Sequence, residues 1–273
     1  MSSPAAAPIS VAHESLGDGT DRAAVVRLNR PDKLNAVDWD MLSALDDALD
    51  AIAVDRTTRC VLVTGEGRAF SAGGDLEKYV TLQRDPVEFP RFVADLHRIF
   101  GRLRQLPVPV IALVNGVTAA GGLELLLNCD FALVAASARV GDGHLNFGQM
   151  GGGGVLTLLP RAIGRERAAE LIFTGRFLDA GEAVAWGLAN RVVPDDALLA
   201  TGLELARQVA EKSPLAVANA KQVLQTVWAD GGPESEGLAL ERETNSVYCL
   251  TSEDAPEGLR AFQEKRRPRF TGR

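Results

Sequence analysis

The stretch VIALVNGVTAAGGLELLLNCD, residues 110–130, has the pattern of a buried strand, a glycine turn and a helix. Its first residues are continuously apolar, which indicates a strand covered on both faces, as in a parallel sheet. A Gly pair follows, and one carboxylate, Glu124, stands in the apolar run after it. Because burying an unpaired carboxylate costs several kcal/mol or more, Glu124 needs either local partners or a function.

The same alternation extends outward from this stretch. Short β-branched runs occur at 23–28, 60–65, 109–116 and 131–136. Helical patterns separate them, notably at 37–54 and 89–103. Strands spaced by helices indicate βα crossovers, so the sequence predicts an α/β fold with a mostly parallel sheet.

The strand signal fades after about residue 160, and the C-terminal third is predicted to be helical. Asp179 and Glu182 have the spacing of a capping box, which predicts a helix start within 178–188. Further helical patterns cover 195–212, 214–229, 237–250 and 253–266. We place the boundary near Val192, which gives a core over 23–192 and a helical region over 193–273.

Composition and charge limit the classes of function. The chain has 273 residues, 46% hydrophobic and 24% charged, as in a globular domain. Its net charge of −7 argues against a nucleic-acid binder. No apolar run approaches the roughly 20 residues that span a bilayer. Residues 1–22 have no basic or apolar segment of a signal peptide, and we expect a disordered leader.

The cysteines and histidines indicate neither a disulfide framework nor a metal site. Cys60, Cys129 and Cys249 are far apart and form no CxxC pair, which favours reduced thiols and a cytoplasmic protein. The three His residues lack the HExxH spacing, so no metal is expected.

Glycine clusters follow two neighbouring strands, in SAGGD (71–75) and NGVTAAGG (115–122). Two such turns can direct two backbone N–H groups to one oxygen, which is the arrangement of an oxyanion hole. Tight turns with close helix packing explain each cluster taken alone more simply. A third run, GGGG (151–154), can open a helix with bare N–H groups, which suits either an anion or a helix–sheet contact.

Taken in order, five segments resemble the enoyl-CoA hydratase/isomerase, or crotonase, superfamily. They are LNRPDKLNAV (28–37), GRAFSAGGDL (67–76), PVIALVNGVTAAGGLELLLNCD (109–130), FTGRFLDAGEAVAWGLANRVVP (173–194) and EGLRAFQEKRRPRFTGR (257–273). The match runs in register from about Val25 to Arg273. The resemblance implies a ClpP-like spiral of ββα turns, with a helical C-terminal region that builds trimers or dimers of trimers.

The resemblance also implies an acyl-CoA thioester substrate and a catalytic apparatus. The N–H groups of Gly74 and Gly121 match the pair that holds the thioester oxygen and stabilises an enolate. Glu124 matches one of the two acids that hydratases place beside the enoyl double bond, as a general acid/base. No cofactor is implied beyond the CoA carried by the substrate.

Further matches concern the CoA moiety. Lys33, Leu34, Ala72 and Asp75 stand at positions that line the CoA nucleotide. Phe262 and Lys265 lie in the tail that contacts CoA, in some members from a neighbouring subunit. For this basic tail, a solvated charged end is an equally good interpretation.

One segment, VGDGHLNFGQMGGGG (140–154), departs from the family pattern. His144 stands where hydratases carry their second glutamate. Imidazole exchanges protons near neutral pH, but its reach and charge differ from those of a carboxylate. Asp142 could orient or charge the ring, although the i, i+2 spacing leaves direct contact open. A histidine that fills the gap without catalysis is an equal alternative.

The sequence therefore predicts a hydratase- or isomerase-like enzyme acting on acyl-CoA. A CoA-thioester hydrolase or decarboxylase using His144 and Asp142 is the second hypothesis, and a non-catalytic acyl-CoA-binding member is the third. The acyl chain is not specified, because it depends on the divergent segment 77–100. Its residues Phe89, Phe92 and Phe100 could line an acyl pocket, but their spacing favours a packed helical face.

Overall fold

The predicted parallel sheet is present in a computed structural model that describes residues 6–229 and 233–273. The strands are β1 (Ile9–Ser15), β2 (Arg22–Leu28), β3 (Thr58–Gly65), β4 (Ala69–Ser71), β5 (Val110–Val114), β6 (Val117–Ala119), β7 (Phe131–Ala135), β8 (Arg139–Gly141), β9 (Phe177–Asp179) and β10 (Arg191–Val193). They form one sheet in the order β1-β2-β3-β5-β7-β10 and a smaller one in the order β4-β6-β8-β9. The pairs β1–β2 and β8–β9 are antiparallel, and all other neighbours are parallel.

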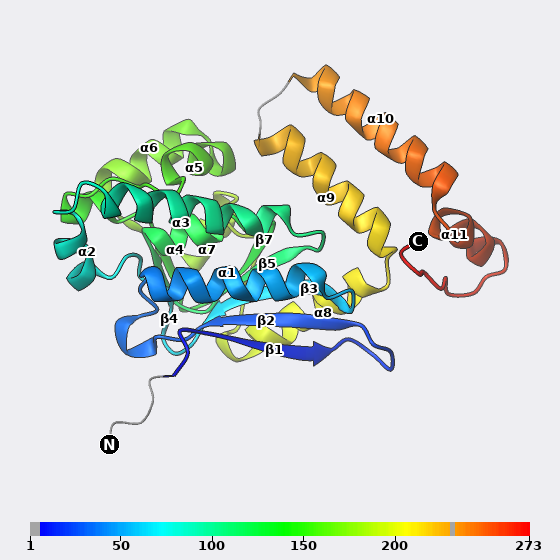
Figure 1. The fold of residues 1–273 in the computed structure, drawn as a ribbon, viewed down its shortest axis with the longest axis horizontal. Coiled ribbons are helices and arrows are strands. Elements are labelled where there is room, and N and C mark those ends of the chain that lie inside the picture. The colour runs from blue at the N-terminus through cyan, green and yellow to red at the C-terminus, as the bar shows by residue number, and fades with distance from the viewer. Residues whose placement is uncertain (1–5, 230–232) are drawn as a thin grey trace.

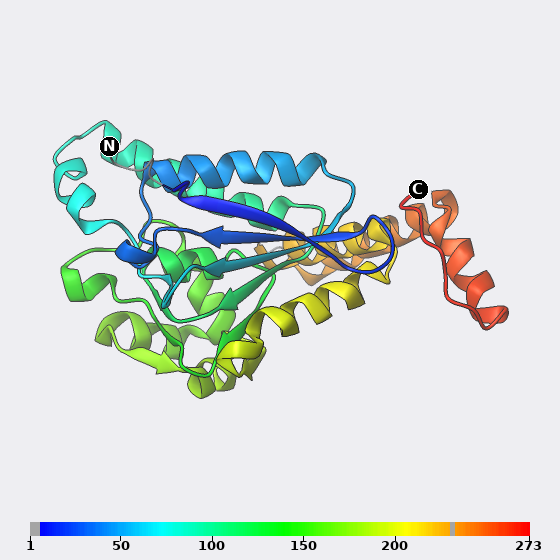
Figure 2. The ribbon, with the colours of Figure 1, turned by 90° about the horizontal axis from the view of Figure 1, so that it is seen from below.

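Helices connect the strands and complete the C-terminal part of the described chain. They are α1 (Trp39–Val54), α2 (Leu76–Leu82), α3 (Glu88–Gln105), α4 (Gly121–Leu126), α5 (Val155–Ile163), α6 (Arg165–Thr174), α7 (Ala180–Ala185), α8 (Leu198–Ala210), α9 (Pro214–Ala229), α10 (Glu234–Thr251) and α11 (Asp254–Gln263). Short 3-10 helices are η1 (Pro31–Lys33), η2 (His144–Phe147) and η3 (Asp195–Ala197). Figure 2 shows α1 on one side of the sheet and α8 on the other. As the sequence predicts, β5 is buried along its whole length, and β3 is buried likewise.

The chain repeats one unit, a long strand, a short strand and a helix. The long strands β3, β5 and β7 pair in the larger sheet, and the short strands β4, β6 and β8 pair in the smaller one. The turn at Gly116 packs so closely on the previous unit that a Cβ there would lie 2.2 Å from the carbonyl oxygen of Arg68. Stacked turns of this kind make the predicted spiral of ββα units.

The expected N-terminal leader is wrong for residues 9–22. Residues 9–15 form β1, which pairs with β2 from Ile9↔Leu28 to Ser15↔Arg22. This edge strand is held by backbone hydrogen bonds and leaves several side chains exposed, such as Val11. Its side chains therefore carry little of the apolar signal on which strand prediction depends. Residues 1–5 lie outside the described part of the chain.

The boundary expected near Val192 coincides with the end of the last strand, since β10 ends at Val193, but the first helix after it does not leave the core. The following helix, α8, still packs on the sheet, and a Cβ on Gly202 would lie 2.8 Å from the Leu113 side chain. The core therefore continues to about residue 212, and the capping box at Asp179 and Glu182 is confirmed within it.

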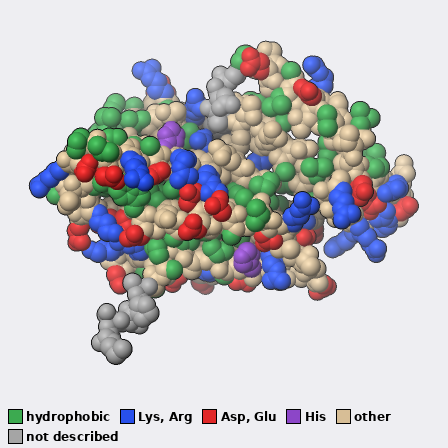
Figure 3. Space-filling view, viewed as in Figure 1, with side chains coloured by type: hydrophobic (Ala, Val, Ile, Leu, Met, Phe, Trp, Pro, Cys, Tyr) green, Lys and Arg blue, Asp and Glu red, His purple; other side chains and the backbone are tan. Residues whose placement is uncertain are grey.

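Helices α9, α10 and α11, here called the C-terminal arm, extend away from the sheets (Figure 1). The arm is anchored at its base by Lys221 on α9, which is 6% exposed. Its ammonium group donates to the carbonyl oxygens of Leu103 and Val108 at 3.0 and 2.9 Å and lies 2.8 Å from the Asp130 carboxylate. Lys and Arg side chains gather around the C-terminal end of the arm (Figure 3).

Replacing Lys221 with Ala should lower the free energy of unfolding by about 3–5 kcal/mol, because it leaves the Asp130 charge uncompensated near the core. Urea unfolding followed by circular dichroism measures this change. Lys212→Ala is the control, since that side chain is exposed and its replacement should alter stability by less than about 0.5 kcal/mol. Equal effects of the two substitutions would show that the buried ion pair does not anchor the arm.

Candidate active site

A cavity of about 480 Å³ opens beside α2, α4 and η2. Its wall includes four of the predicted catalytic residues, namely Gly74, Gly121, Glu124 and His144. They come from three successive units of the spiral, because each follows one of the short strands β4, β6 and β8. The parallel pairing of those strands therefore brings together residues that are far apart in the sequence.

The two glycines of the predicted oxyanion hole are neighbours. A Cβ placed on Gly121 would lie 3.8 Å from the Gly74 nitrogen and 3.6 Å from the Gly73 Cα. Gly121 is the first residue of α4, where an N–H has no acceptor within the helix. Neither the Gly74 nor the Gly121 N–H donates a hydrogen bond within residues 6–229 and 233–273. Two free donors thus lie side by side at the cavity wall.

The turn before Gly121 is strained. Ala120 has φ 47° and ψ −117°, a left-handed conformation that is unusual for a residue with a Cβ. Its N–H donates to the carbonyl oxygen of Asp142 at 2.6 Å. That hydrogen bond from the next unit helps to hold the backbone that presents Gly121.

Glu124 is 2% exposed and is not satisfied by its own helix. Its Oε1 accepts hydrogen bonds from the N–H groups of Gly153 and Val155 at 2.7 and 3.4 Å. Burial raises the pKa of Glu124, although the His144 charge and these two N–H groups act in the opposite direction. A raised pKa of this origin suits a carboxyl group that gives and takes a proton.

The glycine run 151–154 receives this carboxylate. A Cβ on Gly153 would lie 2.6 Å from Glu124 Oε2, so only glycine permits so close a backbone approach. The sequence left open whether this glycine run binds an anion or only contacts the sheet. It binds an anion, the Glu124 carboxylate, at the N-terminus of α5.

His144 and Asp142 are in direct contact. The His144 Nδ1 lies 2.8 Å from Asp142 Oδ1, and the two side chains are 13% and 1% exposed. Burial opposes protonation, but the Asp142 hydrogen bond and the Glu124 charge outweigh it and raise the pKa of His144. A Cβ on Gly151 would lie 3.2 Å from Glu124 Oε1 and 3.5 Å from His144 Cε1. The carboxylate and the imidazole therefore both lie close to Gly151, which stands between the cavity-lining residues Met150 and Gly152 in the sequence.

The residues matched to the CoA nucleotide are partly brought together. Lys33, Ala72 and Asp75 line the cavity, whereas Leu34 does not. The Lys33 ammonium is 2.8 Å from the Glu77 carboxylate. Asp75 is 5% exposed, and its carboxylate caps the N-terminus of α2, so it stabilises the start of that helix.

Phe262 and Lys265 are not brought to this cavity within one chain. They lie in the C-terminal arm, at the opposite end of the molecule from α2 (Figures 1 and 2). Phe262 is 83% exposed.

An apolar part of the wall was missed by the sequence analysis. It includes Tyr79, Val93, Leu96 and Met150. A Cβ on Gly74 would lie 3.2 Å from the Tyr79 ring, which places that ring beside the predicted oxyanion hole. Tyr79, Val93 and Leu96 lie in the divergent segment 77–100, to which the sequence analysis assigned the acyl pocket without singling them out.

The packed face expected for Phe89, Phe92 and Phe100 is confirmed. Phe92 and Phe100 are buried in the core, and Phe89 and Phe92 meet the Tyr79 ring edge-on at 5.6 and 5.7 Å. None of the three lines the cavity. Phe89 and Phe92 instead pack against the Tyr79 ring, which does line the cavity.

The described residues contain no group of three or more His, Cys, Asp or Glu side chains that could hold a metal ion. Among the described helices, none combines the length and apolar character that a bilayer crossing needs.

Comparison with known proteins adds independent evidence. Residues 19–273 match the family model described as enoyl-CoA hydratase/isomerase. A probable enoyl-CoA hydratase of Mycobacterium leprae is 35% identical over 94% of this chain and 98% of its own length. The mitochondrial methylglutaconyl-CoA hydratase of Mus musculus is 36% identical over 91% of this chain and 79% of its own. The crystal structure of an enoyl-CoA hydratase from Bacillus anthracis superposes with a TM-score of 0.90 at 34% identity, covering 97% of this chain and all of the other.

Replacing Glu124 with Gln should stabilise the fold at neutral pH. Burial raises the pKa of this carboxyl above its unfolded value, so keeping it ionised in the folded state costs free energy at high pH. The amide oxygen can still accept the Gly153 N–H. The gain over wild type should therefore grow as the pH rises through the raised pKa, and vanish below the unfolded value of about 4.3.

Urea unfolding of both proteins at several pH values tests this dependence. Glu166→Gln, at an exposed position on α6, is the matched control and should show no comparable gain. A Glu124→Gln protein no more stable than wild type at pH 8 would contradict the expected cost of the buried charge.

Proposed function

Because the chain belongs to the enoyl-CoA hydratase/isomerase family, we propose that it adds water to the double bond of a 2-enoyl-CoA, with Glu124 and His144 as the acid–base pair. Family membership makes it an acyl-CoA-metabolising enzyme. The observation that supports hydration is that Glu124 and His144 line the same cavity and both lie close to Gly151, while the Gly74 and Gly121 N–H groups at the cavity wall are free. Hydration needs a base for water and an acid for carbon, and this pair offers both.

The proposed reaction begins with the thioester oxygen between the Gly74 and Gly121 N–H groups. Ionised Glu124 takes a proton from water as the oxygen of that water bonds to C3, and the double-bond electrons move onto the thioester oxygen. Protonated His144, held by Asp142, then gives its proton to C2 as the enolate collapses. Removing one oxyanion-hole donor typically costs about 2.7–4 kcal/mol of transition-state stabilisation.

Different parts of the cavity wall suit the two parts of the substrate. We assign the part formed by Lys33, Ala72 and Asp75 to the CoA nucleotide, with Leu34 next to Lys33 but outside the wall. The apolar wall that includes Tyr79 then receives the acyl chain. Within the described residues, this cavity wall has no Lys or Arg apart from Lys33, which favours an uncharged acyl group.

The contact between Asp142 and His144 also supports a second candidate. An imidazole oriented by a carboxylate can act as a general base for water at the thioester carbonyl, which would release free CoA. Decarboxylation is less well supported, because an acyl carboxylate would meet no Lys or Arg besides Lys33 among the described residues of the cavity wall. A non-catalytic acyl-CoA-binding protein is the remaining alternative.

Turnover of short- and long-chain 2-enoyl-CoAs, followed by loss of the enoyl-thioester absorbance, tests the proposal. Glu124→Gln and His144→Ala should each lower kcat by about 10²–10⁴-fold, the usual contribution of a general acid or base. The rate should rise with pH as Glu124 ionises and fall again as His144 loses its proton. Since the two groups interact, the limbs report apparent pKa values of the pair.

Other outcomes identify the alternatives. Loss of activity with Glu124→Gln but not with His144→Ala would favour isomerisation by a single acid–base group. Release of free CoA would favour hydrolysis. Tight acyl-CoA binding without any turnover by the wild type would favour a non-catalytic acyl-CoA-binding protein.

We propose further that the chain forms a homotrimer or a dimer of trimers through the C-terminal arm. The arm exposes large apolar side chains, among them Leu250 at 86% and Phe262 at 83%. A neighbouring copy could bring Phe262 and Lys265 to a cavity that their own chain does not reach. A cytoplasmic location, expected from three unpaired cysteines, stays a prediction, and the proposal uses no cofactor besides the CoA of the substrate.

Light scattering should therefore give a mass of three or six times 29.0 kDa. Leu250→Asp should shift that mass toward the single chain, because it puts a charge in an apolar interface. Val54→Asp is the control, since Val54 is 79% exposed on α1, outside the arm. A wild-type protein of 29.0 kDa at micromolar concentration would contradict the assembly.

A further inference from the structure

We infer that Arg30 is a positioning residue, which aims the N–H of Gly74 into the cavity by clamping the two segments that hold the Gly73–Gly74 peptide. The inference rests on the proposed oxyanion hole and adds a residue that does not line the cavity.

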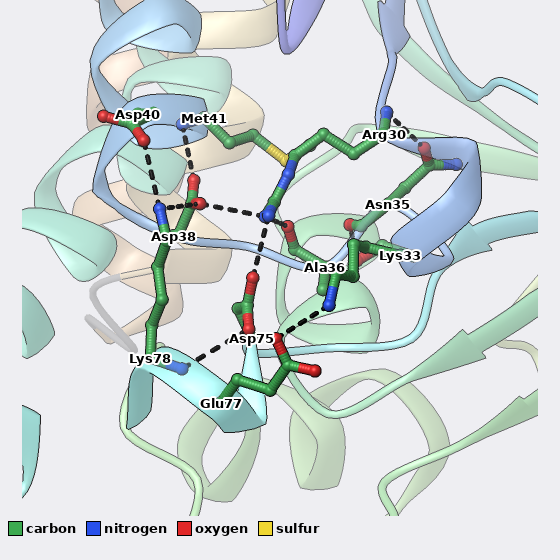
Figure 4. Close-up of polar contacts among 11 residues, drawn as sticks. Arg30, Lys33, Asn35, Ala36, Asp38, Asp40, Met41, Asp75, Glu77 and Lys78 are labelled. Carbon is green, nitrogen blue, oxygen red and sulfur yellow. Dashed lines mark hydrogen bonds and ion pairs between the residues drawn. The ribbon is translucent and has the colours of Figure 1, made fainter. Parts of the chain in front are cut away.

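The Arg30 guanidinium binds three acceptors on two segments. Its Nη1 donates to the carbonyl oxygen of Ala36 at 2.5 Å and lies 3.0 Å from Asp38 Oδ2. Its Nη2 donates to Asp75 Oδ2 at 2.8 Å. Figure 4 shows the guanidinium between the two carboxylates. The first two acceptors flank Val37, and the third directly follows Gly74.

Backbone hydrogen bonds join the same two segments at Gly74. The Val37 N–H donates to the carbonyl oxygen of Gly73 at 2.7 Å, and the Asp75 N–H donates to the carbonyl oxygen of Val37 at 2.9 Å. In a planar trans peptide, the C=O of Gly73 and the N–H of Gly74 point in opposite directions. Holding that carbonyl against Val37 therefore directs the Gly74 N–H away from this segment, on the side where Gly74 lines the cavity.

The carboxylates that bind Arg30 also begin two helices. Asp38 Oδ1 accepts the Met41 N–H at 2.9 Å at the start of α1, and Asp75 Oδ1 accepts the Lys78 N–H at 3.4 Å at the start of α2. Asp38 and Asp75 are 4% and 5% exposed. Arg30 thus fixes the starts of α1 and α2 relative to each other, with the Gly74 segment between them.

Lysine cannot reproduce this clamp. A guanidinium is a planar fork that binds several acceptors in fixed directions, whereas an ammonium is a point charge on a flexible stem. Lys78 also contacts Asp38, at 2.7 Å, but its side chain is 54% exposed. Without Arg30, two nearly buried carboxylates would repel each other, and the Val37–Gly74 bridge would lose its support.

Arg102 provides a matched control. It binds two carboxylates, those of Asp46 and Asp50, and a backbone carbonyl, that of Asp46. Its side chain is 22% exposed, against 19% for Arg30. It lies on α3, and it contacts neither Gly74 nor the cavity.

The first measurement is amide hydrogen exchange of the free protein over residues 72–76. Exchange should be at least about 10-fold faster in Arg30→Gln than in wild type, and unchanged in Arg102→Gln, because only the former releases the bridge. Arg30→Lys should be intermediate. Equal exchange in the two Gln variants would overturn the inference.

The second measurement is the carbonyl stretching frequency of bound [1-¹³C]hexanoyl-CoA, an unreactive saturated thioester. An oxyanion hole polarises the carbonyl and lowers this frequency in the wild type. Arg30→Gln should return the frequency toward the solution value and lower kcat on a 2-enoyl-CoA by up to about 10²–10³-fold, with a smaller change in KM. Arg102→Gln should keep the wild-type shift.

The outcomes separate the inference from the function on which it rests. A wild type that shows no carbonyl shift would contradict the oxyanion hole, while hydrogen exchange would still decide whether Arg30 holds the Gly74 segment. A full wild-type shift in Arg30→Gln would overturn the positioning role alone. If Arg30→Gln does not fold, Arg30→Lys and Asp75→Asn carry the same two measurements.

Discussion

Parallel pairing of β4, β6 and β8 is the constraint on which the site depends. Each of these strands has only three residues, and each is followed by a segment that supplies a different group to the cavity. Strands that run parallel end at the same edge, so Gly74, Gly121 and His144 converge there. The long strands supply the buried area that stabilises the domain, and the short ones determine where the reactive groups lie.

The buried charged groups at this edge of the smaller sheet lower the stability of the fold. A nearly buried carboxylate, Glu124, shares the cavity with an imidazole whose partner, Asp142, is buried as well. Each charge is tolerated because it has specific partners: N–H groups of the glycine run for Glu124, and Asp142 for His144. Burial raises the pKa of Glu124, whereas the Asp142 hydrogen bond and the Glu124 charge outweigh burial and raise the pKa of His144.

The sequence predicts the strands with the strongest apolar pattern, since β3 and β5 are covered on both faces. It does not predict β4, β6 and β8, because three residues are too few to establish a period. The resemblance placed His144 beside Glu124, but only the structure shows that Asp142 reaches the ring. Arg30 and Asp75 are 45 residues apart in the sequence, and no local sequence pattern predicts a contact between residues so far apart. Phe262 and Lys265 match the family tail, yet one chain alone does not bring them to the cavity.

Asp142 serves the site through two separate groups. Its backbone carbonyl holds Ala120, and through it the Gly121 donor, while its side chain holds His144. Any amino acid has a backbone carbonyl, whereas only a few side chains can orient an imidazole. Substitutions at positions 142 and 144 can therefore change the side-chain pair while the backbone hydrogen bond to Ala120 persists. The backbone and the side chains at this edge of the sheet can in that way vary independently of each other.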